Sequence, residues 1–341
     1  MRKNLTLNPF RLDMLIAALV FLAIGLLPLV NHDNYLLTQV TLYLIWAAVV
    51  TQWNLVLGVA GIMSIGHMAL FAAGGYVVAL MGLYLKVSLW EALPLAGLAG
   101  LAISLLLGLA TLRLRGAYVV VVTLSIAMVM YQLIVTDVAC YLKTETVCYA
   151  FSGGARGLSR YGDFGFKALM GYKYIATGNY FVALSALVAG TLFAVVVVHS
   201  PYGRAFQAIR DNEICAAARG IDVAKYRLIV FSAAGLFTGI MGGIYAGTQG
   251  TFGPSVLELP TLLFLLSMMV VGGRGTIWGP IAGTVALALV DEAFSGFAEW
   301  RNTSYAVVLI LILLLMPEGI TGRIATLWRR FFAASKPAGE V

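Results

Sequence analysis

The chain has 341 residues, of which 61% are hydrophobic and 11% are charged, and its mean hydropathy is +0.93. A soluble domain carries about 25% charged residues, so this composition excludes an ordinary soluble protein. The net charge of +7 would suggest nucleic-acid binding in a soluble protein, but in a membrane protein the basic residues are first assigned to loops on one side of the bilayer. We therefore expect a polytopic membrane protein and no nucleic-acid partner.

Long apolar stretches recur along the whole chain. A helix that crosses a bilayer core of about 30 Å needs roughly 20 apolar residues. The apolar stretches cover residues 12–30, 36–57, 62–85, 92–111, 117–136, 179–198, 228–247, 259–272, 278–297 and 303–316. They predict an all-α fold, in which residues 1–341 form a single transmembrane domain, a bundle of about ten helices. The stretch at 259–272 has the length of a helix that crosses only part of the bilayer.

The basic residues predict the orientation of these helices. If the N-terminus is cytosolic, 15 of the 22 Lys and Arg residues fall in segments on the cytosolic side. Five of the other seven lie in one long loop, residues 137–178, where the positive-inside bias is weak. We therefore expect both termini to be cytosolic, with a cytosolic loop at 199–227, a cytosolic tail at 317–341 and the loop at 137–178 outside the cytosol.

Two of the predicted helices carry small residues at every fourth position. The first row is Ala96, Gly100, Ser104 and Gly108, and the second is Gly235, Gly239, Gly243 and Gly247. In lipid, such rows let helix backbones approach closely, and this close packing drives helix association. We expect both helices to pack against protein.

Motifs typical of enzymes are absent from the sequence, which contains no Walker-type P-loop, no His-Glu-x-x-His, no Gly-x-Ser-x-Gly and no dense Cys/His cluster. We therefore expect no catalytic residues, no metal site and no cofactor. Asp291 and Glu292 lie near the end of a predicted helix. Because charged groups at membrane depth are costly and are kept for a function, an ion-coupled secondary transporter that uses these two carboxylates is an alternative.

The longest charged segment between predicted helices on the cytosolic side covers residues 200–222 and predicts a short helix that follows Pro201 and ends at Gly220. Helical spacing places apolar anchors, small side chains and one carboxylate on one face, which a partner surface could receive. The residues that we predict to couple the chain to such a partner are Arg204, Phe206, Ile209, Arg210, Glu213, Ala216, Ala217 and Gly220. The alternative is an ordinary solvated connector.

This segment resembles the coupling loop of ABC importer permeases, because Glu213, Ala216, Ala217 and Gly220 match its Glu-Ala-Ala and glycine elements. The resemblance extends along most of the chain. The stretches that carry it are Asn54–Gly61, Ser64–His67, Gly74–Tyr76, Leu112–Tyr118, Gly272–Gly275, Trp278–Pro280 and Met316–Gly319. In this order they resemble the LivM-type branched-chain amino acid permease family.

The resemblance implies a multi-pass permease of a bacterial-type inner membrane, embedded in membrane lipid. Its implied partners are a second homologous permease, two cytosolic ATPase subunits and an extracytoplasmic solute-binding protein, so ATP hydrolysis is expected on the partners. Branched-chain amino acids are the first substrate class. Relatives that resemble permeases for urea, short amides or aromatic acids share these motifs, and the family's glutamine near position 62 is absent from Ile62-Met63. Those substrates therefore stay open as alternatives.

The glycines between Gly58 and Gly66 are able to interrupt a membrane helix. Irregular backbone at membrane depth is tolerated where it is buried or lines a pathway, and broken helices of transporters face the substrate. The candidates for the translocation pathway are Asn54, Gly61, Ser64, Gly66 and His67. For His67 the alternative is a packing role, with a neutral imidazole hydrogen-bonded to a neighbouring helix.

The predicted outer loop contains two further features. Gly153–Leu158 matches a glycine-rich element of the family and is interpreted as a re-entrant gate, a docking surface for the binding protein or a plain turn. Cys140 and Cys148 lie in the same loop, so an oxidising compartment would permit a disulfide between them. Cys215 lies in the predicted cytosolic segment.

Overall fold

The computed structural model describes residues 9–30, 33–114, 116–143, 148–167, 171–293, 307, 310 and 319–323. Its helices are α1 (Pro9–Gly25), α2 (Leu27–Val30), α3 (Asn34–Asn54), α4 (His67–Leu80), α5 (Leu89–Thr111), α6 (Ala117–Val135), α8 (Ile175–His199), α9 (Pro201–Asp211), α10 (Glu213–Ala218), α11 (Val223–Gln249), α12 (Leu259–Gly272) and α13 (Gly279–Ala293). The short elements are the π-helices η1 (Leu55–Val59) and η2 (Met81–Leu85), the 3-10 turns η3 (Gly154–Arg156), η4 (Tyr172–Tyr174) and η5 (Pro254–Leu257), and the strands β1 (Leu142–Lys143), β2 (Cys148–Tyr149), β3 (Leu158–Ser159) and β4 (Thr251–Phe252).

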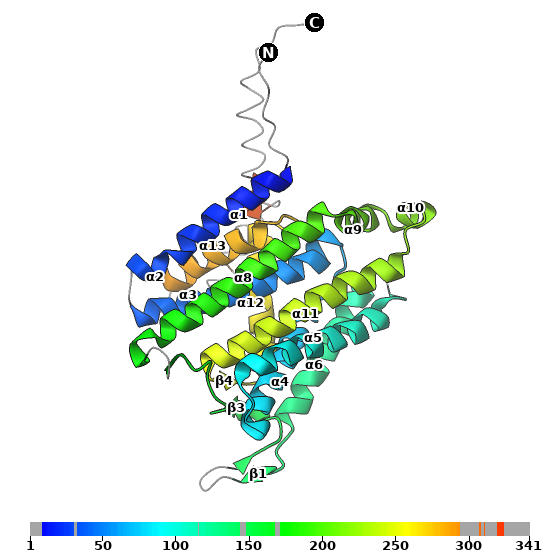
Figure 1. The fold of residues 1–341 in the computed structure, drawn as a ribbon. Coiled ribbons are helices and arrows are strands. Elements are labelled where there is room, and N and C mark those ends of the chain that lie inside the picture. Colours follow the sequence, from blue (N-terminus) through cyan, green and yellow to red (C-terminus); the bar gives the residue numbers. More distant parts are fainter. Residues whose placement is uncertain are drawn as a thin grey trace, which may run out of the picture.

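The long helices lie side by side and give the molecule two opposite ends (Figure 1). The helices α9 and α10 lie at one end, which we call the α9 end, and the strands β1, β3 and β4 lie at the other, the strand end. This places the predicted segments 199–227 and 137–178 at opposite ends of the helix bundle. The predicted helix at 303–316 lies outside the described residues except for single positions, and so do both termini and the tail apart from residues 319–323.

The described part of the chain contains six helical segments long and apolar enough to cross a membrane. They are Asn34–Val59, His67–Leu85, Leu89–Thr111, Ala117–Val135, Tyr172–His199 and Val223–Gln249. The helix α12 has only 14 residues, as expected for a partial crossing, and α1 and α13 have 17 and 15 residues. An all-α polytopic membrane protein is therefore confirmed, whereas the number of ten spans stays a prediction.

The helix α3, continued by η1, forms the centre of the molecule. It packs against α8, α11, α12 and α13. Within the helical segment Asn34–Val59, 83% of an apolar stretch of 18 residues is buried inside the protein. All residues from Leu44 to Asn54 are buried, and none of them is charged, so the segment can be enclosed without leaving a charge unpaired. By contrast, only 22% of an apolar stretch of the same length in α6 is buried, which places α6 at the periphery.

The two rows of small residues pack against each other, as helices α5 and α11. A Cβ atom added to Gly239 would overlap the carbonyl oxygen of Ala96, and one added to Gly100 would overlap the carbonyl oxygen of Gly235. On its other side α11 meets α4, where a Cβ on Gly74 would overlap the carbonyl oxygen of Gly239. The expectation that these helices face protein is confirmed, because backbones approach where only glycine fits.

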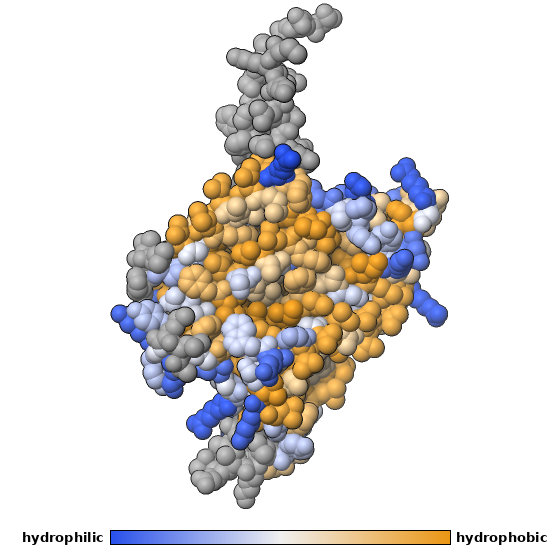
Figure 2. All heavy atoms as spheres, in the orientation of Figure 1, coloured by the Kyte–Doolittle hydropathy of each residue, from blue (hydrophilic) through white to orange (hydrophobic). Residues whose placement is uncertain are grey.

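The outer surface of the bundle is apolar between its two ends. Figure 2 shows hydrophobic residues over the flanks of the helices, with hydrophilic residues gathered toward the α9 end and the strand end. On α5, for example, Leu98, Leu106 and Leu109 are exposed. Such a belt is what a lipid-facing surface requires, since lipid takes up apolar side chains without cost.

We predict that Gly239→Ala destabilises the folded protein, because the added methyl group has to push apart α5 and α11. Overpacking of this kind costs about 1–3 kcal/mol. The measurement is the thermal unfolding midpoint of the detergent-solubilised protein, with Leu106→Met on the exposed face of α5 as the control. An unchanged midpoint for Gly239→Ala would contradict the packing described here.

Candidate functional site

The central helix is interrupted where the sequence predicts. The helix α3 passes into the π-helix η1, which ends at Val59, and α4 begins at His67. Between them the backbone is not helical, and Gly61 has a φ of +71°, which favours glycine. A side chain at Gly58 would overlap the amide oxygen of Asn54 and the backbone nitrogen of Gly275. At the interruption, the backbone of Gly58 therefore packs closely against Gly275.

Asn54 connects the interrupted helix to the segment between α12 and α13. Its Nδ2 donates to the Thr276 carbonyl at 2.8 Å, and its Oδ1 accepts from the Gly275 N–H at 2.8 Å. Thr276 in turn lies 2.9 Å from the hydroxyl of Thr321. The amide of Asn54 thus satisfies one donor and one acceptor of a non-helical backbone, which is otherwise costly inside a membrane. Its place in the translocation pathway stays a prediction.

Ser64 and Gly66 lie in the non-helical segment and are buried. Trp53 Nε1 donates to the Ser64 carbonyl at 2.8 Å, and a Cβ at Gly66 would come within 2.7 Å of the Thr123 carbonyl on α6. Among the described residues, the Ser64 hydroxyl has no hydrogen-bond partner. The segment is therefore held between α3 and α6.

His67, the first residue of α4, is fully buried. Its Nε2 lies 2.8 Å from the Thr238 hydroxyl on α11, and that hydroxyl donates to the Ala234 carbonyl at 2.7 Å. Because the Thr238 hydroxyl uses its proton on Ala234, the imidazole donates from Nε2 to the Thr238 oxygen. The ring also stacks on Trp53, with 5.7 Å between centroids. This is the geometry of the packing alternative, and a role in the pathway stays a prediction.

The segment that we predict to be one helix forms two, α9 and α10. Asn212 separates them with an extended backbone, and its side chain accepts from the N–H groups of Ile214 and Cys215, both at 3.0 Å. Asparagine is a favoured N-cap because its oxygen satisfies N–H groups that lack a partner within the helix. The predicted stop agrees with the structure, since α10 ends at Ala218 and Gly220 has a φ of +84°.

The predicted docking face is largely turned inward, which corrects the expectation from helical spacing. Phe206, Ile209 and Ala216 are all buried, with only 2% of Phe206 exposed. Phe206 belongs to an apolar cluster that includes Leu55, Val56 and Val59 of η1 and Phe231 of α11. Because this chain fills that face with its own core, α9 is attached directly to the interrupted helix.

The charged residues of α9 and α10 also bind within the chain. Arg210 Nη1 donates to the Gly58 carbonyl of η1 at 3.2 Å, and the same guanidinium pairs with Asp211. Glu213 forms a 3.0 Å ion pair with Arg227 on α11. Arg204 is exposed.

The residues left on the surface of this segment are only in part those predicted, since Arg204, Arg210, Ala217 and Gly220 of the predicted set are exposed. Ile214 is 75% exposed, and Ala217, Ala218 and Arg219 beside it are exposed as well. The helical face that a partner could contact is therefore on α10, and Ala217 is the member of the predicted set that lies on it.

Sequence reasoning missed an acidic residue near the α9 end. Asp13 on α1 pairs with His199 at the end of α8, at 2.9 Å, and accepts from Trp278 Nε1 at 3.0 Å. A lone carboxylate inside the first predicted span was the signal that could have identified it. Asp291, which the ion-coupled alternative uses, accepts a hydrogen bond from the Tyr43 hydroxyl of α3.

The glycine-rich element of the loop 137–178 packs against the segment that follows α11. The strand β3 pairs with β4, with Leu158 opposite Phe252. A Cβ on Gly157 would meet the backbone of Gly253, so a glycine is required at this contact. The element is thus a fixed part of the strand end.

Of the cysteines, Cys140 is disulfide-bonded and Cys215 is a free, exposed thiol. Cys148 lies on β2, opposite Lys143 of β1, and its side chain lies outside the described residues. The pairing of Cys140 with Cys148 therefore stays a prediction.

Comparisons with known proteins decide the family of this fold. A family model described as "Branched-chain amino acid transport system / permease component" matches residues 32–316. The chain belongs to this permease family. No solved structure matches the chain.

Two relatives carry the name "High-affinity branched-chain amino acid transport system permease protein LivM". The Salmonella typhimurium protein is 28% identical over 288 residues, which is 78% of this chain and 65% of that protein. The Escherichia coli protein is 28% identical over 301 residues, covering 82% of this chain and 68% of that protein. The chain thus spans about two thirds of the length of these relatives. A more distant relative is the "Ribose import permease protein RbsC" of Bacillus subtilis, 27% identical over 141 residues, or 39% of this chain and 44% of that protein.

We predict that the start of the loop after α6 is held by Asp137 and loosens in acid. Asp137 accepts from the Ser152 N–H and hydroxyl, both at 2.7 Å, and these bonds, the N–H first, lower the pKa of its carboxyl group. Because the folded pKa is depressed, the stabilisation is present above the ordinary pKa and is lost as the pH falls through the folded value.

Hydrogen exchange of the peptide that contains Ser152 measures this effect. We expect slow exchange at neutral pH in the parent and faster exchange at the same pH in Asp137→Asn. Asp163→Asn, in the same loop, is the control. Equal exchange in Asp137→Asn and the parent would show that the loop is held elsewhere.

Proposed function

We propose that the chain is the translocation subunit of an ATP-driven, binding-protein-dependent importer of branched-chain amino acids. The family match along residues 32–316 and the two LivM relatives support this function. The importer would contain a second homologous permease, two ATPase subunits and an extracytoplasmic binding protein, in a bacterial inner membrane. In this proposal the α9 end faces the cytosol, and the strand end faces the binding protein.

The observation that carries the proposal is the attachment of α9 to the interrupted helix. Phe206 belongs to the same apolar cluster as Leu55, Val56 and Val59 of η1, and Arg210 donates to the carbonyl of Gly58 within η1. At the same time, Ile214 and Ala217 on the adjoining helix α10 are exposed. A movement imposed on α10 by an ATPase would therefore reach the centre of the bundle through α9.

Uptake into proteoliposomes tests the function as a whole. The assembled transporter should accumulate leucine when ATP is enclosed and the binding protein is present, and a collapsed proton and sodium gradient should leave this uptake intact. Uptake that needs the ion gradient and no ATP would instead support the ion-coupled alternative. Competition by urea, short amides and aromatic acids then separates the remaining substrate classes.

We predict that Ala217→Trp weakens ATPase binding, because a bulky side chain replaces a small one on the exposed face of α10. The control is Ala102→Trp, the same substitution at an exposed position of α5. The amount of ATPase that co-purifies with the permease is the measurement. Undiminished co-purification of Ala217→Trp would show that the ATPase binds another surface.

We also predict that Arg210→Gln uncouples the transporter. Hydrogen bonds to charged groups contribute about 1.5–3 kcal/mol, so losing the contact to Gly58 should lower the solute transported per ATP by about tenfold. Arg210→Lys, which keeps the charge, should retain more transport than Arg210→Gln. Arg113→Gln, an exposed arginine just after α5 and outside this segment, is the control. A parental ratio of transport to hydrolysis in Arg210→Gln would rule out this role.

A further inference from the structure

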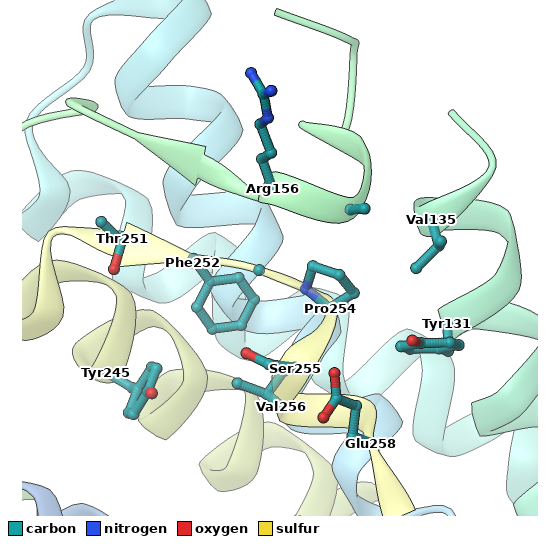
Figure 3. Close-up of a pocket in the computed structure, with 12 residues that line it drawn as sticks. Tyr131, Val135, Arg156, Tyr245, Thr251, Phe252, Pro254, Ser255, Val256 and Glu258 are labelled. Carbon is teal, nitrogen blue, oxygen red and sulfur yellow. The ribbon is translucent and has the colours of Figure 1, made fainter. Parts of the chain in front are cut away.

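The strand end contains a cavity of about 360 Å³, a size typical of small-molecule sites. It is formed where α6, the glycine-rich element and the segment between α11 and α12 converge, with Tyr131 and Val135 on one side and Phe252, Pro254 and Val256 on another. Figure 3 shows these side chains around the central Pro254. None of the residues that we predicted for the pathway from the sequence lines this cavity.

The convergence of these segments is fixed by backbone contacts. Gly157 packs against Gly253 so closely that a Cβ would come within 2.5 Å of the Gly253 Cα, and β3 and β4 pair on the same side. Phe252 is buried against Phe71 and Tyr76 of α4. The apolar wall of the cavity is therefore a continuation of the protein core.

Two opposite charges, on Arg156 and Glu258, are part of the lining of this cavity. Arg156 ends η3, and Glu258 directly precedes α12. Both side chains are exposed, and neither takes part in an ion pair among the described residues. In Figure 3 they lie on opposite sides of Pro254, and the guanidinium of Arg156 extends away from it. A surface arginine changes rotamer within nanoseconds, so it is able to turn toward a bound solute.

We propose that this cavity binds a zwitterionic α-amino acid with an apolar side chain during its passage through the permease. Glu258 accepts hydrogen bonds from the α-ammonium group, and Arg156 donates to the α-carboxylate, a pairing that suits the planar guanidinium. The apolar side chain of the solute lies against Phe252, Val256 and Val135. This inference rests on the proposed function and assigns it a substrate site at the strand end.

The charges distinguish between the substrate classes that the sequence leaves open. An aromatic acid without an ammonium group would pair with Arg156 but would place its negative charge near Glu258. Urea and short amides carry no charge and would leave both residues unpaired. A site built to bind two charged groups discriminates against solutes that lack one of them. An amino acid is the one class among these that pairs with both residues.

The test uses the assembled transporter in proteoliposomes with its binding protein. We expect Arg156→Gln and Glu258→Gln each to lower leucine import about tenfold or more. Arg160→Gln in the same loop and Glu91→Gln on α5, both exposed and outside the cavity, are the matched controls and should import like the parent. Arg156→Lys and Glu258→Asp retain the charges, and import by them should exceed that of the Gln variants.

A second readout separates substrate binding from docking of the binding protein. The concentration of binding protein that gives half-maximal stimulation of ATP hydrolysis should be the same in the parent and in the Gln variants. If this concentration rises in the variants, the two charges bind the binding protein and the proposal is wrong.

The remaining outcomes also decide the question. Parental import by both Gln variants, or equal loss in the Gln variants and their charge-retaining counterparts, would overturn the substrate site and leave the proposed function standing. A parent transporter that accumulates another solute and no α-amino acid would instead overturn the proposed function.

Discussion

The structure depends on one constraint, which is that a non-helical backbone inside a membrane must find hydrogen-bond partners within the protein. The central helix stops being regular at η1, and hydrogen bonds to distant segments satisfy polar groups of both the central helix and those segments. Arg210 donates to the carbonyl of Gly58, and the amide of Asn54 bonds to Gly275 and Thr276. These same bonds join α9, the central helix and the segment before α13. The hydrogen bonds that satisfy the non-helical backbone therefore also connect α9 mechanically to the central helix.

Close backbone packing makes this connection stiff. The helix α11 meets α5 and α4 through glycines that tolerate no side chain, such as Gly239, and the apolar cluster around Phe206 leaves η1 little freedom to move independently of α9. Interiors packed in this way change between discrete arrangements rather than deform gradually. A permease that alternates its access between two sides of a membrane needs such behaviour.

Much of the fold could be predicted from the sequence, because hydropathy, glycine rows and the segment 200–222 are local patterns. The interruption after Asn54 followed from glycines, and the packing of α5 and α11 against protein followed from small residues at fixed spacing, whereas their contact with each other is seen only in the structure. Helical spacing failed at Asn212, where a side-chain cap outweighed the periodicity. It grouped Phe206 and Ile209 on one face but could not show that this chain's own core covers that face. The cavity near Glu258 could not be predicted, since its walls come from segments about a hundred residues apart whose contact is set by tertiary packing.

The central claim is that α9 and the non-helical segment after η1 move as one unit during transport. Met63 and Asp211 line the same cavity of about 260 Å³ between these two segments, so cysteines at both positions can be joined by a short bifunctional reagent in a Cys215→Ser background. Transport is then measured for the cross-linked transporter and for each labelled single-cysteine variant. We expect the cross-linked transporter to keep the transport rate of the single-cysteine variants. Loss of transport on cross-linking alone would show that the two segments must separate, and would contradict this claim.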